Sequence, residues 1–186
     1  MAKKLDIAYR IAVIATAVAA VLSLVFVIIC VAEVDKLDEM TKDFMVKFAF
    51  IIEMFYAAFA GSVISVVLSI CSAKESKPLF VVGRTLFISV VLFIQVSALK
   101  TVNGMYPVLR AFKKYDFETE ADLKNTEAED LGLTQDQVDS FLSGDDIENG
   151  IVALALAIIF GAAVYFVIGI ISAVSLANKK KKETLM

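Results

Sequence analysis

The sequence predicts an all-α protein, an integral membrane four-helix bundle with four transmembrane helices and both termini inside. Between the third and fourth helices it predicts a partly helical extracytoplasmic segment. Hydrophobic residues make up 59% of the 186 residues, and the mean hydropathy is +0.79. About half is usual for a soluble domain. The hydrophobic residues gather in four stretches without any charge, and the segments between these stretches alternate between basic and acidic.

The four uncharged stretches are residues 11–32, 54–73, 85–99 and 149–178. A membrane-spanning helix needs about 20 mostly apolar residues, and the third stretch reaches that length only when Arg84 is included. Four buried helices of a soluble protein are the alternative, but residues 11–32 show no polar face. We expect one domain, residues 1–186, with spans at about 7–32, 46–73, 79–102 and 150–177 and an outer acidic segment at 103–149.

A cleaved signal peptide is an alternative interpretation of the first span. Its apolar run is longer than the 7–15 residues that are typical of a signal sequence, and no small-residue cleavage pattern follows it. We therefore expect an uncleaved helix. Cys30 and Cys71 fall near opposite ends of the first two spans, so no disulfide between them is expected.

The charges of the connecting segments predict the orientation in the membrane. Basic residues precede the first span, lie in the short connection at 74–77 and follow the fourth span at 179–182. Positive charge in short loops marks the cytoplasmic side, so both termini are expected to be cytoplasmic. Residues 101–150 contain twelve acidic and four basic residues, which places them outside. The four lysines at 179–182 either anchor this topology or bind anionic lipid. A bacterial plasma membrane is the expected location for so short and lysine-rich a chain.

The outer segment is too long for a structureless loop and carries signals for helices. Asn103, Gly104 and Pro107 are expected to end the third helix, and residues 106–115 have the pattern of an amphipathic helix near the membrane interface. Thr134 and Gln137 form a capping box for a second helix, which Gly144 is expected to stop. Its apolar residues are expected to dock on the chain's own bundle or on a partner protein: Leu133, Val138, Phe141 and Leu142.

Few signals for chemistry occur in this chain. It has no histidine and no tryptophan, no C-x-x-C pair and no glycine-rich nucleotide motif. Asp145, Asp146 and Glu148 could supply oxygen ligands to Ca²⁺, but acids before a helix are favourable in any case. We expect no enzyme activity, no catalytic residue, no cofactor, no metal and no nucleic acid.

Small residues recur at every fourth position in three of the spans, of which the first has Ala8, Ala12, Thr16 and Ala20. The second span has Ala57, Gly61, Ser65 and Ser69, and the fourth has Gly161, Gly169 and Ala173. Small residues on one helix face let backbones approach closely in lipid. These series predict helix-packing edges and a close crossing between the second and fourth spans.

Glu53 begins the series of the second span, so it is expected to face the bundle interior. An intramembrane carboxylate indicates a functional site by default. By depth, we expect a hydrogen-bonded layer of Glu53, Gln95 and Ser23, with Lys100 as the counter-ion. Alternatively, Glu53 lies high enough to reach water. Arg84 either extends to the membrane surface or, because Gln95 eleven residues later shares its face, points inward toward Ser69 or Ser172.

These observations lead to two functional hypotheses. The first is a non-enzymatic interaction or accessory subunit of a membrane complex, which presents its acidic outer segment to a protein partner. The second is a small oligomeric cation or proton channel or transporter in which Glu53 lines the path. Besides the lipid bilayer, we therefore expect a protein partner or a homo-oligomer.

Overall fold

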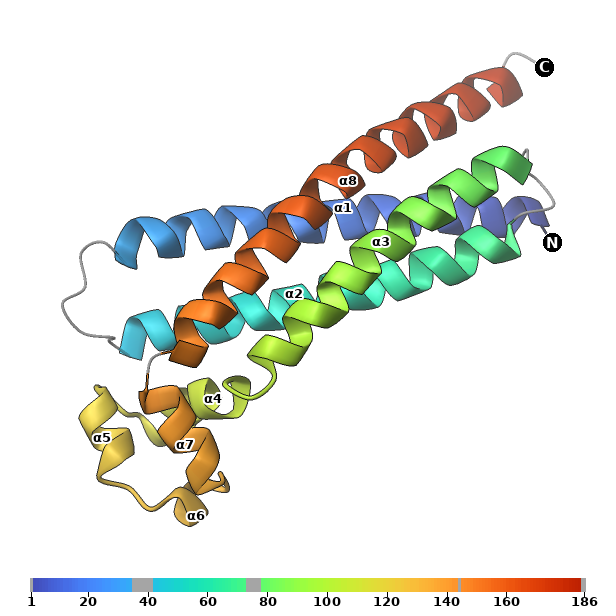
Figure 1. The fold of residues 1–186 in the computed structure, drawn as a ribbon. Coiled ribbons are helices and arrows are strands. Elements are labelled where there is room, and N and C mark those ends of the chain that lie inside the picture. Colours follow the sequence, from blue (N-terminus) through green and yellow to red (C-terminus); the bar gives the residue numbers. More distant parts are fainter. Residues whose placement is uncertain (1, 35–41, 73–77, 144, 185–186) are drawn as a thin grey trace.

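The computed structural model describes residues 2–34, 42–72, 78–143 and 145–184. Its four long helices are α1 (Ala2–Val34), α2 (Lys42–Cys71), α3 (Pro78–Val102) and α8 (Asp145–Thr184). Each of them contains a stretch long and apolar enough to cross a membrane. Over the described residues, all regular secondary structure is helical. The helices run alternately in opposite directions, so the N and C ends of the chain lie at the same end of the bundle (Figure 1).

The four long helices form a square in which α2 and α8 occupy opposite corners. α1 packs along both α2 and α8, and α3 packs along the same two helices. The predicted close crossing of the second and fourth spans is therefore wrong. Their glycines approach α1 instead: a Cβ added at Gly61 would lie 2.3 Å from the Oγ1 of Thr16, and one at Gly169 would lie 3.1 Å from the Cβ of Ala17.

The every-fourth-residue series also fails as a single packing face. Each residue turns an α-helix by about 100°, so a step of four residues drifts by about 40°. Along α2 the series starts exposed at Ala57 and becomes buried only at Ser65 and Ser69. Along α8 it starts buried at Gly161 and ends exposed at Ala173. The series therefore winds around each helix, and only part of it meets a neighbour.

Residues 103–143 form a small helical cap at the end of the bundle away from the termini (Figure 1). The cap contains α4 (Tyr106–Tyr115), α5 (Glu120–Lys124), α6 (Ala128–Leu131) and α7 (Gln135–Leu142). As predicted, α3 ends at Val102, and Pro107 lies in the first turn of α4, where its missing N–H leaves no bond unmade. The capping box of α7 is also present: the Gln137 N–H donates to Thr134 Oγ1, and the Thr134 N–H donates to Gln137 Oε1.

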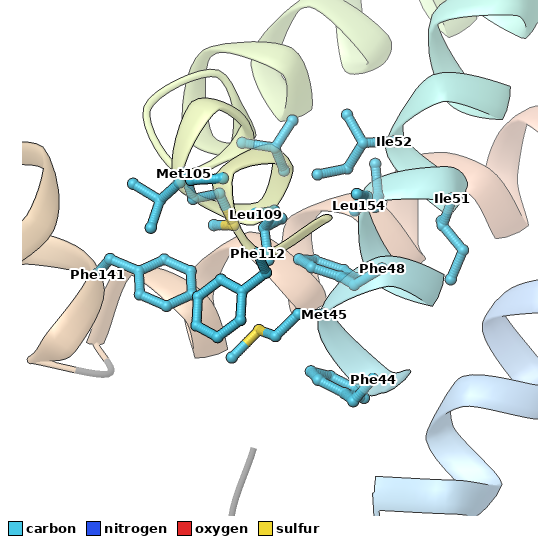
Figure 2. Close-up of a cluster of buried hydrophobic side chains, with 14 of the residues drawn as sticks. Phe44, Met45, Phe48, Ile51, Ile52, Met105, Leu109, Phe112, Phe141 and Leu154 are labelled. Carbon is cyan, nitrogen blue, oxygen red and sulfur yellow. The ribbon is translucent and has the colours of Figure 1, made fainter. Parts of the chain in front are cut away.

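The cap and the adjacent end of the bundle share one hydrophobic core, shown in Figure 2. Phe112 of α4 contacts Phe141 of α7, with their ring centroids 6.1 Å apart. Further buried members come from the cap, from α2 and from α8: Met105, Leu109, Met45, Phe48, Ile52 and Leu154. An ion pair between Lys42 of α2 and Glu118 of the cap (3.1 Å) adds a polar contact at the rim. The cap is therefore packed onto the bundle rather than suspended from it.

The fourth long helix starts earlier than residue 150, because α8 begins at Asp145. The three acids of the possible Ca²⁺ segment thus fall in the first turn of a helix, where negative charge is favourable. Their side chains lie outside the described part of the chain.

Candidate functional site

A cluster of polar side chains is buried in the half of the bundle nearer the chain termini. At its centre is Arg84 of α3, which is 6% exposed. Its Nε donates to the Oγ of Ser69 at 2.8 Å, and its Nη2 donates to the carbonyl of Ser69 at 3.0 Å and to the Oγ of Ser72. Both serines belong to the last turn of α2 and the residue after it. This is the inward orientation expected from the spacing between Arg84 and Gln95.

α1 supplies the other side of the cluster. The Cζ of Arg84 lies over the Tyr9 ring, 4.1 Å from the ring centroid, which is a cation–π contact. Arg10 directly follows Tyr9, and its Nε donates at 3.1 Å to the Oδ2 of Asp6, which lies one turn earlier in α1. Asp6 is 2% exposed. Two guanidinium groups therefore share the immediate neighbourhood of one buried carboxylate. Tyr9 and Asp6 were not predicted from the sequence, in which Arg10 served only as a marker of topology.

The Arg84 guanidinium is incompletely satisfied. Its Nη1 is buried and has no hydrogen-bond partner among the residues that the structure describes. Arginine stays protonated in proteins, so it cannot relieve this by losing its proton. A buried donor without a partner costs roughly 1–3 kcal/mol, and more when it is charged. Such a donor indicates either a strained structural residue or a position where a ligand atom is expected.

A groove of about 690 Å³ opens beside this cluster, between α3 and α8. Arg10, Arg84, Tyr9 and Ser172 provide the polar part of its lining. The remaining walls are apolar side chains and Gly83, with Leu79 and Phe87 from α3 and Phe160, Val164, Val167 and Ile168 among those from α8.

Further polar groups lie along the bundle interior without a complete set of partners. The hydroxyl of Tyr9 and the Oε1 of Gln95 are buried and have no hydrogen-bond partner among the described residues, whereas the buried Tyr165 hydroxyl lies close to Ser62 and Ser65. Tyr165 occupies the centre of the bundle, although in the sequence it stands out only as a break in the small-residue series of α8.

The predicted layer around Glu53 is not formed. Glu53 lies on the exposed surface of α2 and accepts a hydrogen bond from the Tyr106 hydroxyl at 3.0 Å. Gln95 is 2% exposed and lies near Gly161 of α8, whereas Ser23 donates to the carbonyl of Ala19 in its own helix. Lys100 is exposed. The reason is helical drift: Glu53 is twelve residues before Ser65, which rotates it by about 120° from that buried position.

The Glu53 side chain instead belongs to a group at the junction of bundle and cap. The Tyr56 hydroxyl donates to the Oδ1 of Asn103 at 3.2 Å, and the Tyr56 and Tyr106 rings meet edge to face with centroids 5.8 Å apart. Burial raises the pKa of the Tyr106 hydroxyl, and its hydrogen bond to Glu53 raises it further. Tyrosines are enriched at membrane interfaces, so this position fits the alternative in which Glu53 reaches water.

The apolar residues of the predicted docking helix are turned toward the chain itself. Leu133, Val138 and Phe141 are buried and Leu142 is partly buried, all within the shared core. α7 contacts α4, α5, α6 and α8. A partner that meets the cap would therefore meet its polar outer surface.

Comparison of the chain with models of known families, with curated proteins and with solved structures finds no match. The function therefore has to be inferred from the geometry alone. Within the described residues, no group of three or more histidine, cysteine, aspartate or glutamate side chains is placed to hold a metal ion.

Proposed function

We propose that this chain is a non-enzymatic integral membrane protein, an accessory subunit that presents an acidic cap to a protein partner. The proposal rests on the distribution of apolar and acidic side chains in the cap. Its apolar residues pack inward around Phe112 and Phe141, whereas its exposed surface carries many carboxylates. The exposed acids are Asp116, Glu118, Glu127, Glu129, Asp130, Asp136 and Asp139.

The sidedness is part of this proposal. The basic N-terminal segment, the ends of α2 and α3 that flank residues 74–77, and the basic end of α8 lie together, away from the cap (Figure 1). The positive-inside rule then puts both termini in the cytoplasm and the cap outside. We expect the cell to be bacterial. An acidic surface steers basic partners toward it and repels a second acidic cap, so we expect a different protein rather than another copy.

The alternative is an oligomeric cation or proton conduit in which Glu53 lines a path between subunits. Glu53 is exposed on α2 with Tyr106 as its partner, so it could line only a path between subunits and not one through the bundle. The interior holds the Arg84 guanidinium, and a positive charge there raises the energy of a cation in the same space.

The test is site-specific photo-crosslinking in living cells. A photoreactive residue at Glu129 of the cap should give one defined crosslinked protein, and the same residue at Phe93, 73% exposed on α3, should not. The charge-reversal variant carries Glu129→Lys and Asp130→Lys, and its photoreactive residue is moved to Asp136. This variant should not form the crosslink. Lys124→Glu, which adds acid to the cap, should preserve it. A crosslink that persists after charge reversal would rule out acidic recognition.

A second measurement separates the orientation from the partner. In a Cys30→Ser, Cys71→Ser background, a membrane-impermeant maleimide on intact cells should label Asp136→Cys in the cap. Asn178→Cys, exposed near the end of α8, should be labelled only after lysis. The opposite pattern would overturn the proposed orientation.

A further inference from the structure

We propose that the groove between α3 and α8 is a binding site for one anionic phospholipid. Its phosphate contacts the guanidinium groups of Arg84 and Arg10, and an acyl chain lies along the apolar walls. The inference goes beyond the accessory role and needs only that the helices lie in a bilayer, whatever their orientation.

The shape and lining of the groove suit an amphiphile. Its volume of about 690 Å³ is within the usual range for small-molecule sites. The polar groups gather where α1 approaches, at Tyr9, Arg10 and Arg84, while Phe87 and Phe160 extend the apolar wall. A ligand that fills this groove therefore needs a charged end and a hydrocarbon part. A free anion would satisfy only the polar residues.

The charges select an anionic headgroup. Arg84 and Arg10 contribute two positive charges, and Asp6 contributes one negative charge that Arg10 already engages. The Nη1 of Arg84, on a side chain more than nine-tenths buried, has no partner within residues 2–34, 42–72, 78–143 and 145–184. Guanidinium groups bind phosphate oxygens with strong, directional hydrogen bonds. A zwitterionic headgroup would bring its own cation toward two arginines, so an anionic headgroup such as phosphatidylglycerol is favoured.

The bundle also offers a matched control surface. A second groove of about 360 Å³ lies between α1 and α8, and the described residues that line it are all uncharged. Phe166 lines this second groove and Phe87 lines the first, and both are exposed. Because the chain has no tryptophan, a Phe→Trp substitution at either position gives a single fluorescent reporter.

The experiment is quenching of each reporter in phosphatidylcholine vesicles that contain brominated phosphatidylglycerol or brominated phosphatidylcholine. For Phe87→Trp we expect about a fivefold preference for phosphatidylglycerol, the effect of roughly one basic residue at a lipid surface. For Phe166→Trp we expect almost no preference. Equal preferences at the two positions would overturn the proposal, because they would report only general attraction of anionic lipid.

The role of Arg84 is tested in the same two backgrounds. Arg84→Met should reduce the preference at Phe87→Trp to that at Phe166→Trp, whereas Arg84→Lys should keep most of it. Circular dichroism and the unchanged quenching of Phe166→Trp establish that each variant is folded. A preference that survives Arg84→Met would also overturn the proposal, and Arg10→Met offers a second substitution for the same comparison if Arg84→Met does not fold.

Discussion

The Tyr106 hydroxyl donates a 3.0 Å hydrogen bond to Glu53, which ties the first turn of the cap helix α4 to the middle of α2. Glu53→Gln keeps an acceptor, so it should change the free energy of unfolding by less than about 0.5 kcal/mol. Glu53→Leu and Tyr106→Phe should each lower it by about 1 kcal/mol. Unfolding in detergent measures all three. The double variant should cost no more than either single one, and simple additivity would contradict the pairing.

The contact between Gly61 and Thr16 predicts a steric effect in the bundle. A methyl group at Gly61 would lie 2.3 Å from the Thr16 Oγ1, so Gly61→Ala should destabilise the protein by about 1–3 kcal/mol. Thr16→Ala removes that oxygen and should restore part of the loss. A methyl group at Gly83 would meet nothing within 4 Å, so Gly83→Ala is the matched control and should be neutral or slightly stabilising. Equal effects of the two Gly→Ala changes in thermal unfolding would refute the close approach.

Arg84 should be unnecessary for folding in detergent. Ser69 retains a 2.8 Å hydrogen bond with Thr85, and the Ser72 hydroxyl retains the carbonyl of Ser69 at 3.1 Å. Burial of the guanidinium carries a desolvation cost and leaves its Nη1 without a partner among the described residues, and an apolar side chain of similar length removes both costs. Arg84→Met should therefore leave the melting midpoint unchanged or higher when no anionic lipid is present.

Added phosphatidylglycerol should change the difference in melting midpoint between the unaltered chain and Arg84→Met. A ligand that binds only the folded state raises the melting midpoint, so the lipid should stabilise the unaltered chain and not Arg84→Met. If Arg84→Met alone lowers the midpoint by many degrees without lipid, the residue has a structural role instead.

The pH dependence of the cap should follow Asp122. The backbone N–H groups of Thr119 and Glu118 donate to its Oδ2 at 3.0 and 2.8 Å and lower the pKa of the carboxyl below its ordinary value of 3.8. Because the folded-state pKa is the lower one, this interaction stabilises the cap above pH 3.8 and is lost as the pH falls through the folded-state value.

Hydrogen exchange measures this effect. After correction for intrinsic rates, the amides of residues 118–122 should be protected above pH 3.8 and should lose protection over the acid range below it. Asp122→Asn should already exchange faster at the upper end of this range and show little further change. Protection that is independent of pH in the unaltered chain would contradict the assignment.

Phe141 should determine the stability of the cap. It is 2% exposed against Phe112, so Phe141→Ala should cost about 3–5 kcal/mol and expose the cap to protease. Phe93→Ala removes an equally large side chain from an exposed position on α3 and should have no such effect. Limited proteolysis in detergent, followed by mass spectrometry, should find new cleavages within residues 116–143 only for Phe141→Ala. Equal resistance of both variants would show that α7 is not held by this contact.

The presence of four long apolar helices and of the cap helices α4 and α7 could be predicted because their signals are local, although α8 is longer than the predicted 150–177. Charge-free runs mark the spans, and the Thr134–Gln137 capping box marks the start of α7. Which side of each span packs inward could not be predicted in the same way. In a membrane-type helix the outer surface is as apolar as the packed surface, so Phe93 and Ile88 look alike in sequence although one is exposed and the other fully buried.

The position of Glu53 differs from the prediction for a geometric reason. An every-fourth-residue series drifts by about 40° per step, which moves Glu53 out of the buried sector that contains Ser65 and Ser69. A polar pattern was the better guide: Ser62, Ser65, Ser69 and Ser72 follow steps of three and four, which track a buried face of α2 and the residue that follows it. The last two of these serines, Ser69 and Ser72, accept hydrogen bonds from Arg84.

The position of α1 has a consequence for assembly during synthesis. Its neighbouring residues Thr16 and Ala17 meet glycines of α2 and α8 respectively. The ribosome delivers α2 soon after α1, so a hairpin closed at Thr16 can form early. The surface at Ala17 stays uncovered until the last of the four long helices is made. The contact between α1 and α8 is therefore the last of these helix contacts to form, because α2 and α3 are both made before α8.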